Sequence, residues 1–325
     1  MGKAMKKLAH GFNKGYQRFR KYVLAPPAFL IMDLVGFKRH LPYTCTGDDA
    51  QKLIRDKLLG DAPCMIGRIG SSEIRCIEGV LHKDGTVWQK LKWLLTFNQP
   101  WPSKKLQRAW RSFEDNPDDA FLEKYTRMTM DDIEQLDVFA AWRWEEYEVF
   151  KEPYGFDIIS LGDLEPFFSP TPWTAALRGK KVLVVQPFVE DIASQYRRRE
   201  KLFANPDVLP EFELHTYMPF FRGLRDDPGN WFERVEIMKR EVAEIDFDVA
   251  LIAASTYGFP LAAHIKRLGR KAVIMGGVLQ LLFGIRGARW DVEPAYRNFY
   301  NEYWIRPGEN TKPRDFHKIE GGCYW

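Results

Sequence analysis

Residues 64–74 of the chain read Cys64-Met65-Ile66-Gly67-Arg68-Ile69-Gly70-Ser71-Ser72-Glu73-Ile74. A short apolar run ends at two glycines, and a helical pattern begins directly after them. A strand that ends in a glycine turn and opens a helix leaves backbone N–H groups unpaired, and these groups favour an anion. The stretch therefore predicts a strand, a turn and a helix, with an anion-binding site at the turn.

The side chains of this turn fit a phosphate and metal site. Arg68 carries a fork of N–H donors that suits a phosphate. Glu73 is a carboxylate that suits a divalent cation or a sugar hydroxyl. The alternative is a well-capped helix, with Ser71 or Ser72 as its N-cap and with Arg68 in a surface ion pair.

The composition is that of a globular chain with a large core. The chain has 325 residues, of which 45% are hydrophobic and 28% are charged, and this length suggests one large domain or two tightly joined ones. The net charge of +4 is too small to indicate a nucleic-acid partner. The four cysteines have neither a disulfide-framework nor a zinc-site spacing, which indicates a reduced, cytoplasmic setting. No apolar run reaches the roughly 18 residues of a membrane span.

Residues 1–40 are predicted to form a basic extension in front of a single α/β domain over residues 41–325. The first 24 residues contain seven lysines or arginines and no acid. Leu8, Phe12 and Phe19 fall near one helical face. This pattern is typical of a basic amphipathic helix on an anionic membrane surface, and it predicts peripheral attachment to the inner membrane face. The alternative is a disordered or packed N-terminal extension.

Strands and helices are predicted to alternate along the rest of the chain. Apolar runs of strand length occur at residues 64–69, 137–142, 157–160, 180–185, 213–217, 248–254 and 271–275. Helical patterns occur at 46–60, 71–81, 190–203, 231–245 and 258–268, with a mostly helical insertion at about 87–136. Because the strands lack polar alternation and are separated by helices, we expect a Rossmann-like α/β fold, with a mostly parallel sheet and helices on both faces. Such sheets bind ligands at the carboxyl ends of their strands.

Three further strand ends carry small or polar residues. In chain order these segments contain Gln186, then Tyr257 and Gly258, then Gly276, Gly277 and Gln280, with Arg286 beyond them. The double glycine allows a backbone to approach a phosphate or sugar closely, or forms only a tight turn before the next helix. His264, in the helix at 258–268, is a candidate general base, although a lone histidine among apolar residues is more often structural. No GxGxxG follows a strand and no GxxxxGK[ST] occurs, so dinucleotide and Walker-type sites are disfavoured.

Two stretches resemble a known family. Arg68-Ile69-Gly70-Ser71-Ser72-Glu73 resembles the Arg-x-Gly-Asp-Gly-Glu signature of the GT-D type glycosyltransferases. The stretch from Gly276 to Asp291 resembles a segment of bacterial polysaccharide-cluster proteins related to that group. The resemblance spans roughly residues 60–325. It implies a nucleotide-sugar site beside an Asp-x-Glu motif that is associated with metal-assisted donor binding.

The chain departs from the family pattern at one position. By position, the family's glutamate falls on Glu73 and its aspartate on Ser71. The resemblance thus implies Glu73 as the ligand of a divalent cation, Mn²⁺ or Mg²⁺, but a hydroxyl is a weaker ligand than a carboxylate. Either another acid completes the site, the diphosphate supplies most of the ligands, or this branch works without metal. Asp163 and Glu165 have the Asp-x-Glu spacing, although solvated loop acids are the simpler interpretation.

We therefore expect a glycosyltransferase that moves a sugar from a nucleotide diphosphate sugar to a glycan or lipid-linked acceptor in cell-surface polysaccharide synthesis. Glu73 and His264 are the expected catalytic residues, with His264 deprotonating the acceptor. Donor binding is assigned to Arg68, Gly70, Ser71, Ser72, Gln186, Tyr257, Gly258, Gly276, Gly277, Gln280 and Arg286. Two alternatives remain: a non-catalytic nucleotide-sugar or glycan-binding partner in a polysaccharide assembly complex, and a pyruvyl or phosphoryl transferase on a similar sheet.

Overall fold

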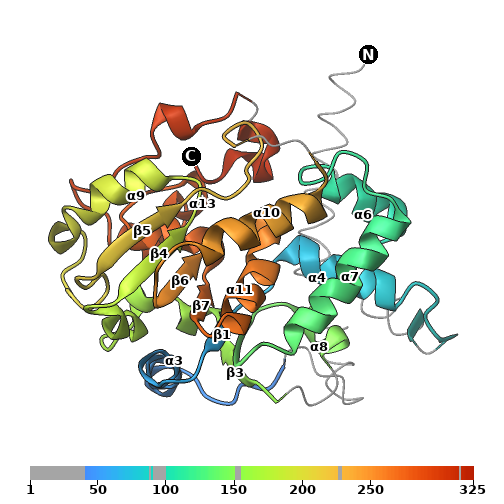
Figure 1. The fold of residues 1–325 in the computed structure, drawn as a ribbon, viewed down its shortest axis with the longest axis horizontal. Helices are drawn as coiled ribbons and strands as arrows, with labels where there is room; N and C mark the ends of the chain where they lie inside the picture. Colours follow the sequence, from blue (N-terminus) through green and yellow to red (C-terminus); the bar gives the residue numbers. More distant parts are fainter. Residues whose placement is uncertain (1–40, 88, 91–99, 151–154, 226–228, 315) are drawn as a thin grey trace.

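A seven-stranded sheet forms the centre of the molecule (Figure 1). The computed structural model describes residues 41–325, except 88, 91–99, 151–154, 226–228 and 315. The strands lie in the order β3-β2-β1-β7-β6-β4-β5, and every pairing between neighbours is parallel. Their bounds are β1 (Cys64–Gly67), β2 (Val138–Ala141), β3 (Asp157–Ser160), β4 (Lys181–Val185), β5 (Glu213–Tyr217), β6 (Val249–Ile252) and β7 (Lys271–Ile274).

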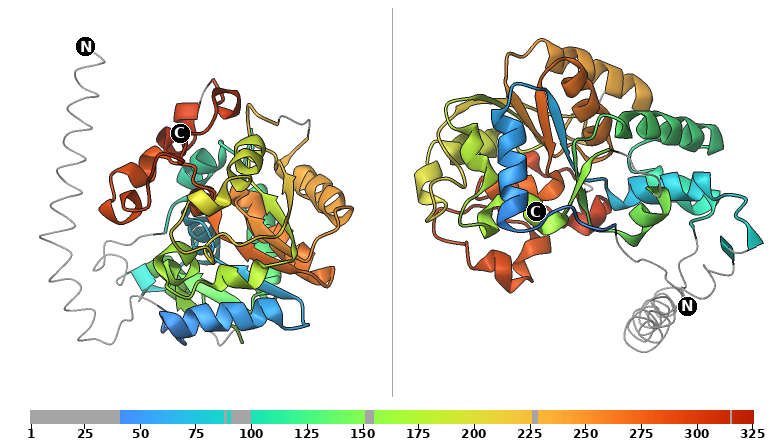
Figure 2. Two further views of the ribbon diagram at one scale, coloured as in Figure 1. Left: turned by 90° about the vertical axis from the view of Figure 1, so that its left-hand side faces the viewer. Right: turned by 90° about the horizontal axis from the view of Figure 1, so that it is seen from below.

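Helices cover both faces of the sheet, as the views in Figure 2 show. The first face packs against α4 (Ser71–Leu81), α7 (Asp119–Ile133), α10 (Trp231–Ala243) and α11 (Gly258–Arg267), with α6 (Ser103–Trp110) and α8 (Trp144–Val149) beside α4. The second face packs against α3 (Asp48–Leu59), α9 (Val189–Tyr196) and α12 (Leu279–Leu282). The short helices α13 (Ala288–Asp291) and α14 (Pro294–Arg297) follow α12 in the chain.

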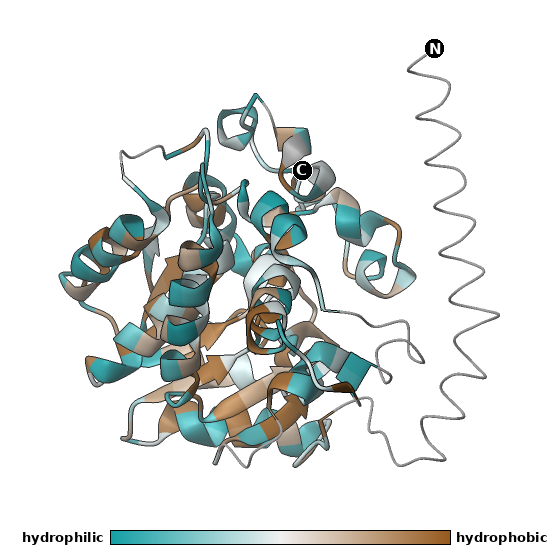
Figure 3. Ribbon diagram, turned by 90° about the vertical axis from the view of Figure 1, so that its right-hand side faces the viewer, coloured by the Kyte–Doolittle hydropathy of each residue, from teal (hydrophilic) through white to brown (hydrophobic). Residues whose placement is uncertain are grey.

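The sheet is apolar because it is buried on both faces. Every residue of β1, β2 and β6 is buried, which explains why their sequences run without polar alternation. Figure 3 shows the apolar strands inside and the more polar helices around them. Leu183 and Ala250 belong to the core on the first face, whereas Val182 and Val249 belong to the core on the second.

A crevice forms where β1 and β7 lie side by side. The chain leaves β1 toward α4 on the first face, but it leaves β7 toward the 3₁₀ turn Gly276–Val278 and α12 on the second face. When two neighbouring parallel strands send their connections to opposite faces, the space beyond their carboxyl ends stays open for a ligand. The turn after Gly67 borders this space.

The predicted α/β fold is confirmed, and the predicted strands and helices agree closely with the observed ones. One helix differs: the pattern at 190–203 forms α9, which ends at Tyr196, followed by the 3₁₀ turn Arg199–Lys201. Of the predicted insertion at about 87–136, the described part contains α6 and α7. The predicted basic helix at residues 1–40 and its membrane surface lie outside the described residues. Within the described ranges, no helix is long and apolar enough to cross a membrane.

Candidate functional site

A cavity of about 710 Å³ lies at the carboxyl edge of the sheet. Its volume falls in the range of small-molecule binding sites, roughly 300–1,000 Å³. Segments that follow each of the seven strands contribute to its wall, together with α6, α10 and the C-terminal segment. Nine predicted site residues line it: Arg68, Gly70, Ser71, Ser72, Glu73, Gln186, Tyr257, Gly276 and Gly277.

Arg68 lies at the β1–β7 crevice. Gly276 has a positive φ of 68°, and a methyl group there would stand 1.8 Å from Arg68 Nη2. The guanidinium therefore packs directly on the Gly276 backbone, and its carbon lies 5.9 Å from the ring centre of Trp142. No carboxylate of the described residues forms an ion pair with Arg68. The surface ion pair of the predicted alternative is thus absent among the described residues.

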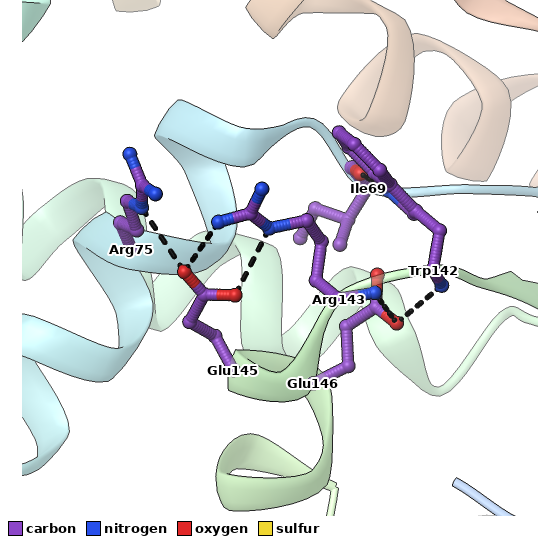
Figure 4. Close-up of polar contacts among 6 residues, drawn as sticks. All are labelled: Ile69, Arg75, Trp142, Arg143, Glu145 and Glu146. Carbon is purple, nitrogen blue, oxygen red and sulfur yellow. Dashed lines mark hydrogen bonds and ion pairs between the residues drawn. The ribbon is translucent and has the colours of Figure 1, made fainter. Parts of the chain in front are cut away.

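A polar network holds Trp142 against the backbone of Ile69, the residue that follows Arg68 (Figure 4). The indole N–H of Trp142 donates to the backbone oxygen of Ile69 at 3.0 Å. Glu146, at the start of α8, accepts hydrogen bonds from the backbone N–H groups of Trp142 at 2.8 Å and Arg143 at 2.9 Å. Burial raises the pKa of Glu146 to about 8, and these two hydrogen bonds lower it. The end of β2 is thus fixed against the turn that follows β1.

The N-terminus of α4 faces the cavity. Its N-cap is Gly70 and not Ser71 or Ser72, so the predicted serine cap is wrong, and Ser71 and Ser72 line the cavity instead. A methyl group at Gly70 would stand 2.0 Å from Glu73 Oε2, so the Glu73 carboxylate folds back over Gly70. Burial raises the pKa of Glu73, while Arg68 and the backbone at Glu73 and Gly70 lower it. The Glu73 carboxylate thus covers the helix start at Gly70, and Ser71 and Ser72 are the first-turn residues that line the cavity beside it.

The protein's side chains do not make a complete divalent-cation site. In the part of the chain that the structure describes, no group of three or more histidine, cysteine or acidic side chains is arranged to hold a metal ion. Glu73 is a single carboxylate turned toward its own helix start, and Ser71 is a weak ligand. Mn²⁺ and Mg²⁺ prefer several oxygen ligands in octahedral geometry. The side chains at this site therefore do not supply the oxygen ligands that Mn²⁺ or Mg²⁺ requires.

Arginines outnumber acids in the described lining of the cavity. Five arginines line it (Arg68, Arg222, Arg225, Arg234 and Arg289), against three glutamates (Glu73, Glu165 and Glu320). Three of these arginines pair with acids: Arg225 with both carboxylate oxygens of Glu241 at 2.9 and 2.8 Å, Arg222 with Asp115 and Arg289 with Glu320. Arg68 has no such partner among the described residues, so it is suited to an anionic ligand.

Glu165 is a buried acid of the cavity wall. It follows the 3₁₀ turn Leu161–Leu164 after β3, and only 8% of its surface is exposed. The Tyr296 hydroxyl donates to its Oε2 at 2.9 Å. The interpretation as a solvated loop acid is therefore wrong for Glu165. Asp163 instead caps the turn, where it accepts from the backbone N–H of Gly47 at 2.9 Å.

The C-terminal segment closes one side of the cavity. Tyr324 lies over Gly277, where a methyl group would stand 2.6 Å from the tyrosine ring. Gln280, one of the predicted donor-binding residues, donates to the backbone oxygen of Tyr324 at 3.1 Å. Gln280 is fully buried and does not line the cavity. Gln280 instead stabilises the C-terminal segment that forms this side of the cavity.

Three other predicted site residues also lie outside the cavity lining. His264 is more than one turn into α11, beside Lys239 of α10, and burial lowers its pKa. Six residues along a helix advance about 9 Å from its start, which carries His264 away from the strand ends. Gly258 packs against Ile252 and Ile274 side chains. The Arg286 guanidinium stacks on Tyr300, with its carbon 4.7 Å from the ring centre.

Sequence reasoning missed the segment that follows β5. Arg222 and Arg225 reach the cavity from it, and Arg234 reaches it from the first turn of α10. The sequence feature that could have identified them is the pair of arginines, Arg222 and Arg225, shortly after the predicted strand at 213–217. Ser255, after β6, also lines the cavity and has a positive φ of 50°, which is rare for a residue other than glycine and is concentrated at functional sites.

Comparisons of the chain with protein-family models, with curated proteins and with solved structures found no match. The residues of the site and their geometry therefore carry the functional argument.

Proposed function

We propose that this protein is a glycosyltransferase that moves a sugar from a nucleotide diphosphate sugar to a glycan or lipid-linked acceptor in cell-surface polysaccharide synthesis. The observation that carries this proposal is the position of Arg68. Its guanidinium has no ion-pair partner among the described residues, and it lines the cavity together with Ser71 and Ser72 of the first turn of α4. A helix N-terminus and a guanidinium together bind phosphate oxygens well.

The chemistry of the proposed reaction matches this arrangement. The bond that breaks joins the sugar to a diphosphate, so negative charge develops on the diphosphate as it leaves. Arg68 and the N–H groups of Ser71 and Ser72 are fixed donors for that charge, and fixed donors in a partly desolvated site lower the barrier. The side chains of the site do not form a complete set of ligands for a divalent cation, so the proposed reaction has no step that depends on a metal.

The aromatic wall fits the other parts of the donor. Trp142, Phe188, Tyr257 and Trp290 line the cavity, and aromatic faces pack well against nucleobases and against the C–H groups of sugar rings. A nucleotide diphosphate sugar combines these surfaces with the anion that the arginines require.

Donor binding and transfer test the proposal. We expect at least one nucleotide diphosphate sugar to raise the melting temperature of the protein, because a ligand of the folded state stabilises it. Mass analysis of the acceptor should then show an added sugar. Arg68→Lys should weaken donor binding about tenfold or more, because lysine lacks the fork of donors. Arg286→Lys is the matched control, since Arg286 lies outside the lining, and it should leave binding unchanged.

A second function has an observation in its favour. Ser71 stands where the family that the chain resembles has a metal-binding aspartate, which fits a non-catalytic nucleotide-sugar or glycan-binding partner in a polysaccharide assembly complex. Binding of a donor with no transfer to any acceptor of a broad panel would support this second function. Absence of binding by every nucleotide diphosphate sugar would contradict the transferase, and absence of glycan binding as well would contradict the second function.

A further inference from the structure

The position of Glu165 gives the cavity an acid with a chemical role still to be assigned. Its carboxylate belongs to the wall of the cavity but is 8% exposed. Tyr296 of α14 donates its hydroxyl to both carboxylate oxygens, at 2.9 and 3.3 Å. A single neutral donor leaves each carboxylate oxygen with a lone pair for a further hydrogen bond.

The other acids of the lining are engaged differently. Glu73 folds over Gly70 at the start of α4, and Glu320 pairs with Arg289. Among the described lining residues there is neither a histidine nor an aspartate. His264, the base expected from the sequence, lies outside the lining. Glu165 is therefore the acid of the described wall that is fixed by a tyrosine and not by a cation.

The charged and titratable groups around Glu165 tune its proton affinity. Burial raises the pKa of Glu165 to about 7, and the Tyr296 hydrogen bond and the nearby Arg68 charge lower it from a still higher value. Catalytic bases work best when their pKa lies near the working pH. At neutral pH a large share of the Glu165 side chains is deprotonated and able to accept a proton.

We propose that Glu165 is the general base that deprotonates the acceptor hydroxyl, and that Tyr296 is its positioning residue. This assignment rests on the proposed function. In the step, the acceptor oxygen forms a bond to the anomeric carbon as the bond between that carbon and the diphosphate oxygen breaks. The electron pair of the broken bond leaves with the nucleoside diphosphate, beside Arg68. The proton of the acceptor hydroxyl moves to the Glu165 carboxylate.

The first test uses the isosteric variant Glu165→Gln in the full chain. We use the nucleotide diphosphate sugar that gives the largest thermal shift with the unaltered protein. We expect kcat to fall at least 100-fold while the donor Kd stays within threefold, because glutamine keeps the shape of the side chain but takes up no proton. Glu244→Gln, at an exposed residue outside the lining, is the control and should keep full activity.

The second test uses the pH profile and does not depend on the first variant. The kcat/KM of the unaltered protein should fall as pH decreases through about 7. Tyr296→Phe removes a hydrogen bond that favours the charged carboxylate, so this limb should move to higher pH. Tyr303→Phe, beyond the end of α14 at Arg297 and outside the lining, should leave the limb in place.

The assignment of Glu165 as the base and the proposed function would be overturned by different results. Donor binding with unimpaired turnover in Glu165→Gln would overturn the assignment of the base and leave the proposed function intact. An unmoved pH limb in Tyr296→Phe would overturn the positioning role. Lack of any donor binding by the unaltered protein would instead overturn the proposed function, and this assignment with it.

Discussion

At the scale of single residues, two glycines shape the site by what they lack. Gly276 leaves room for the Arg68 guanidinium, and Gly70 leaves room for the Glu73 carboxylate. A side chain at either position would occupy the space of a charged group. Gly70, at the start of α4, and Gly276, after β7, therefore do more than form turns, because each lets an ionic side chain lie directly on the backbone.

Gly276→Ala should disable the donor site. Alanine at a φ of 68° is strained, which costs about 1 kcal/mol of folding free energy, and its methyl group would also displace Arg68. We expect donor affinity to fall about tenfold or more, measured by titration calorimetry. Gly179→Ala is the matched control: its φ of 70° gives the same strain, but a methyl group there meets no atom within 4 Å. Equal donor affinity in both variants would contradict the assigned position of Arg68.

The residue scale is also where the sequence was least informative. Asp163 and Glu165 are separated by one residue, yet one caps a turn and the other lines the cavity. Local spacing does not distinguish these environments, because the difference comes from Tyr296, which lies far along the chain. His264 shows the converse, since its residue type suggested a base but its place along α11 puts it outside the cavity lining.

At the scale of elements, the junction of β2 and α8 supports the site from behind. Glu146 is fully buried and binds the backbone N–H groups of Trp142 and Arg143. Glu145 is also buried and receives hydrogen bonds from Arg75 at 3.0 Å and Arg143 at 2.9 Å. These contacts join α8 to α4, so the ring that flanks Arg68 belongs to a rigid unit.

Glu146→Gln should reveal how much the ionisation of this buried acid lowers the free energy of unfolding. The folded-state pKa of Glu146, about 8, lies above its unfolded value. Protonation therefore favours the folded state, and this contribution is lost as pH rises toward 8. The free energy of unfolding of Glu146→Gln, relative to the unaltered protein, should increase by roughly 3–4 kcal/mol from pH 5 to pH 8, because each pKa unit corresponds to about 1.4 kcal/mol. Denaturant titrations at both pH values measure it, with the exposed Glu134→Gln as a control. A pH-independent difference would show that Glu146 ionises normally.

At the scale of the whole molecule, the site exists because seven strand ends meet at one edge. The cavity takes residues from segments that lie far apart in the sequence, including the turn at 68–73, the segment after β5 and the C-terminal segment. The order of the sheet brings β1 beside β7, and their connections diverge to opposite faces. This arrangement opens the crevice that Arg68 borders.

Removal of divalent cations tests whether the assembled site needs a metal ion to bind the nucleotide diphosphate sugar. Because the described side chains include no three-ligand metal group, and because arginines supply the positive charge of the wall, we expect EDTA to leave the donor Kd within twofold. Calorimetry with and without EDTA measures this. A loss of affinity greater than tenfold, restored by Mn²⁺ or Mg²⁺, would show that the bound diphosphate recruits a cation.

The sequence by itself determined the succession of strands and helices and the parallel sheet, and it predicted an anion-binding site at the turn at 68–72. These features depend on local patterns: apolar runs, glycine turns and the free N–H groups of a helix start. Only the tertiary structure decided that Arg68 meets Gly276, that Tyr296 fixes Glu165, and that arginines from the segment after β5 and from α10 complete the wall. Such contacts depend on the order of strands in the sheet, and that order is set by packing between segments that are distant in the chain.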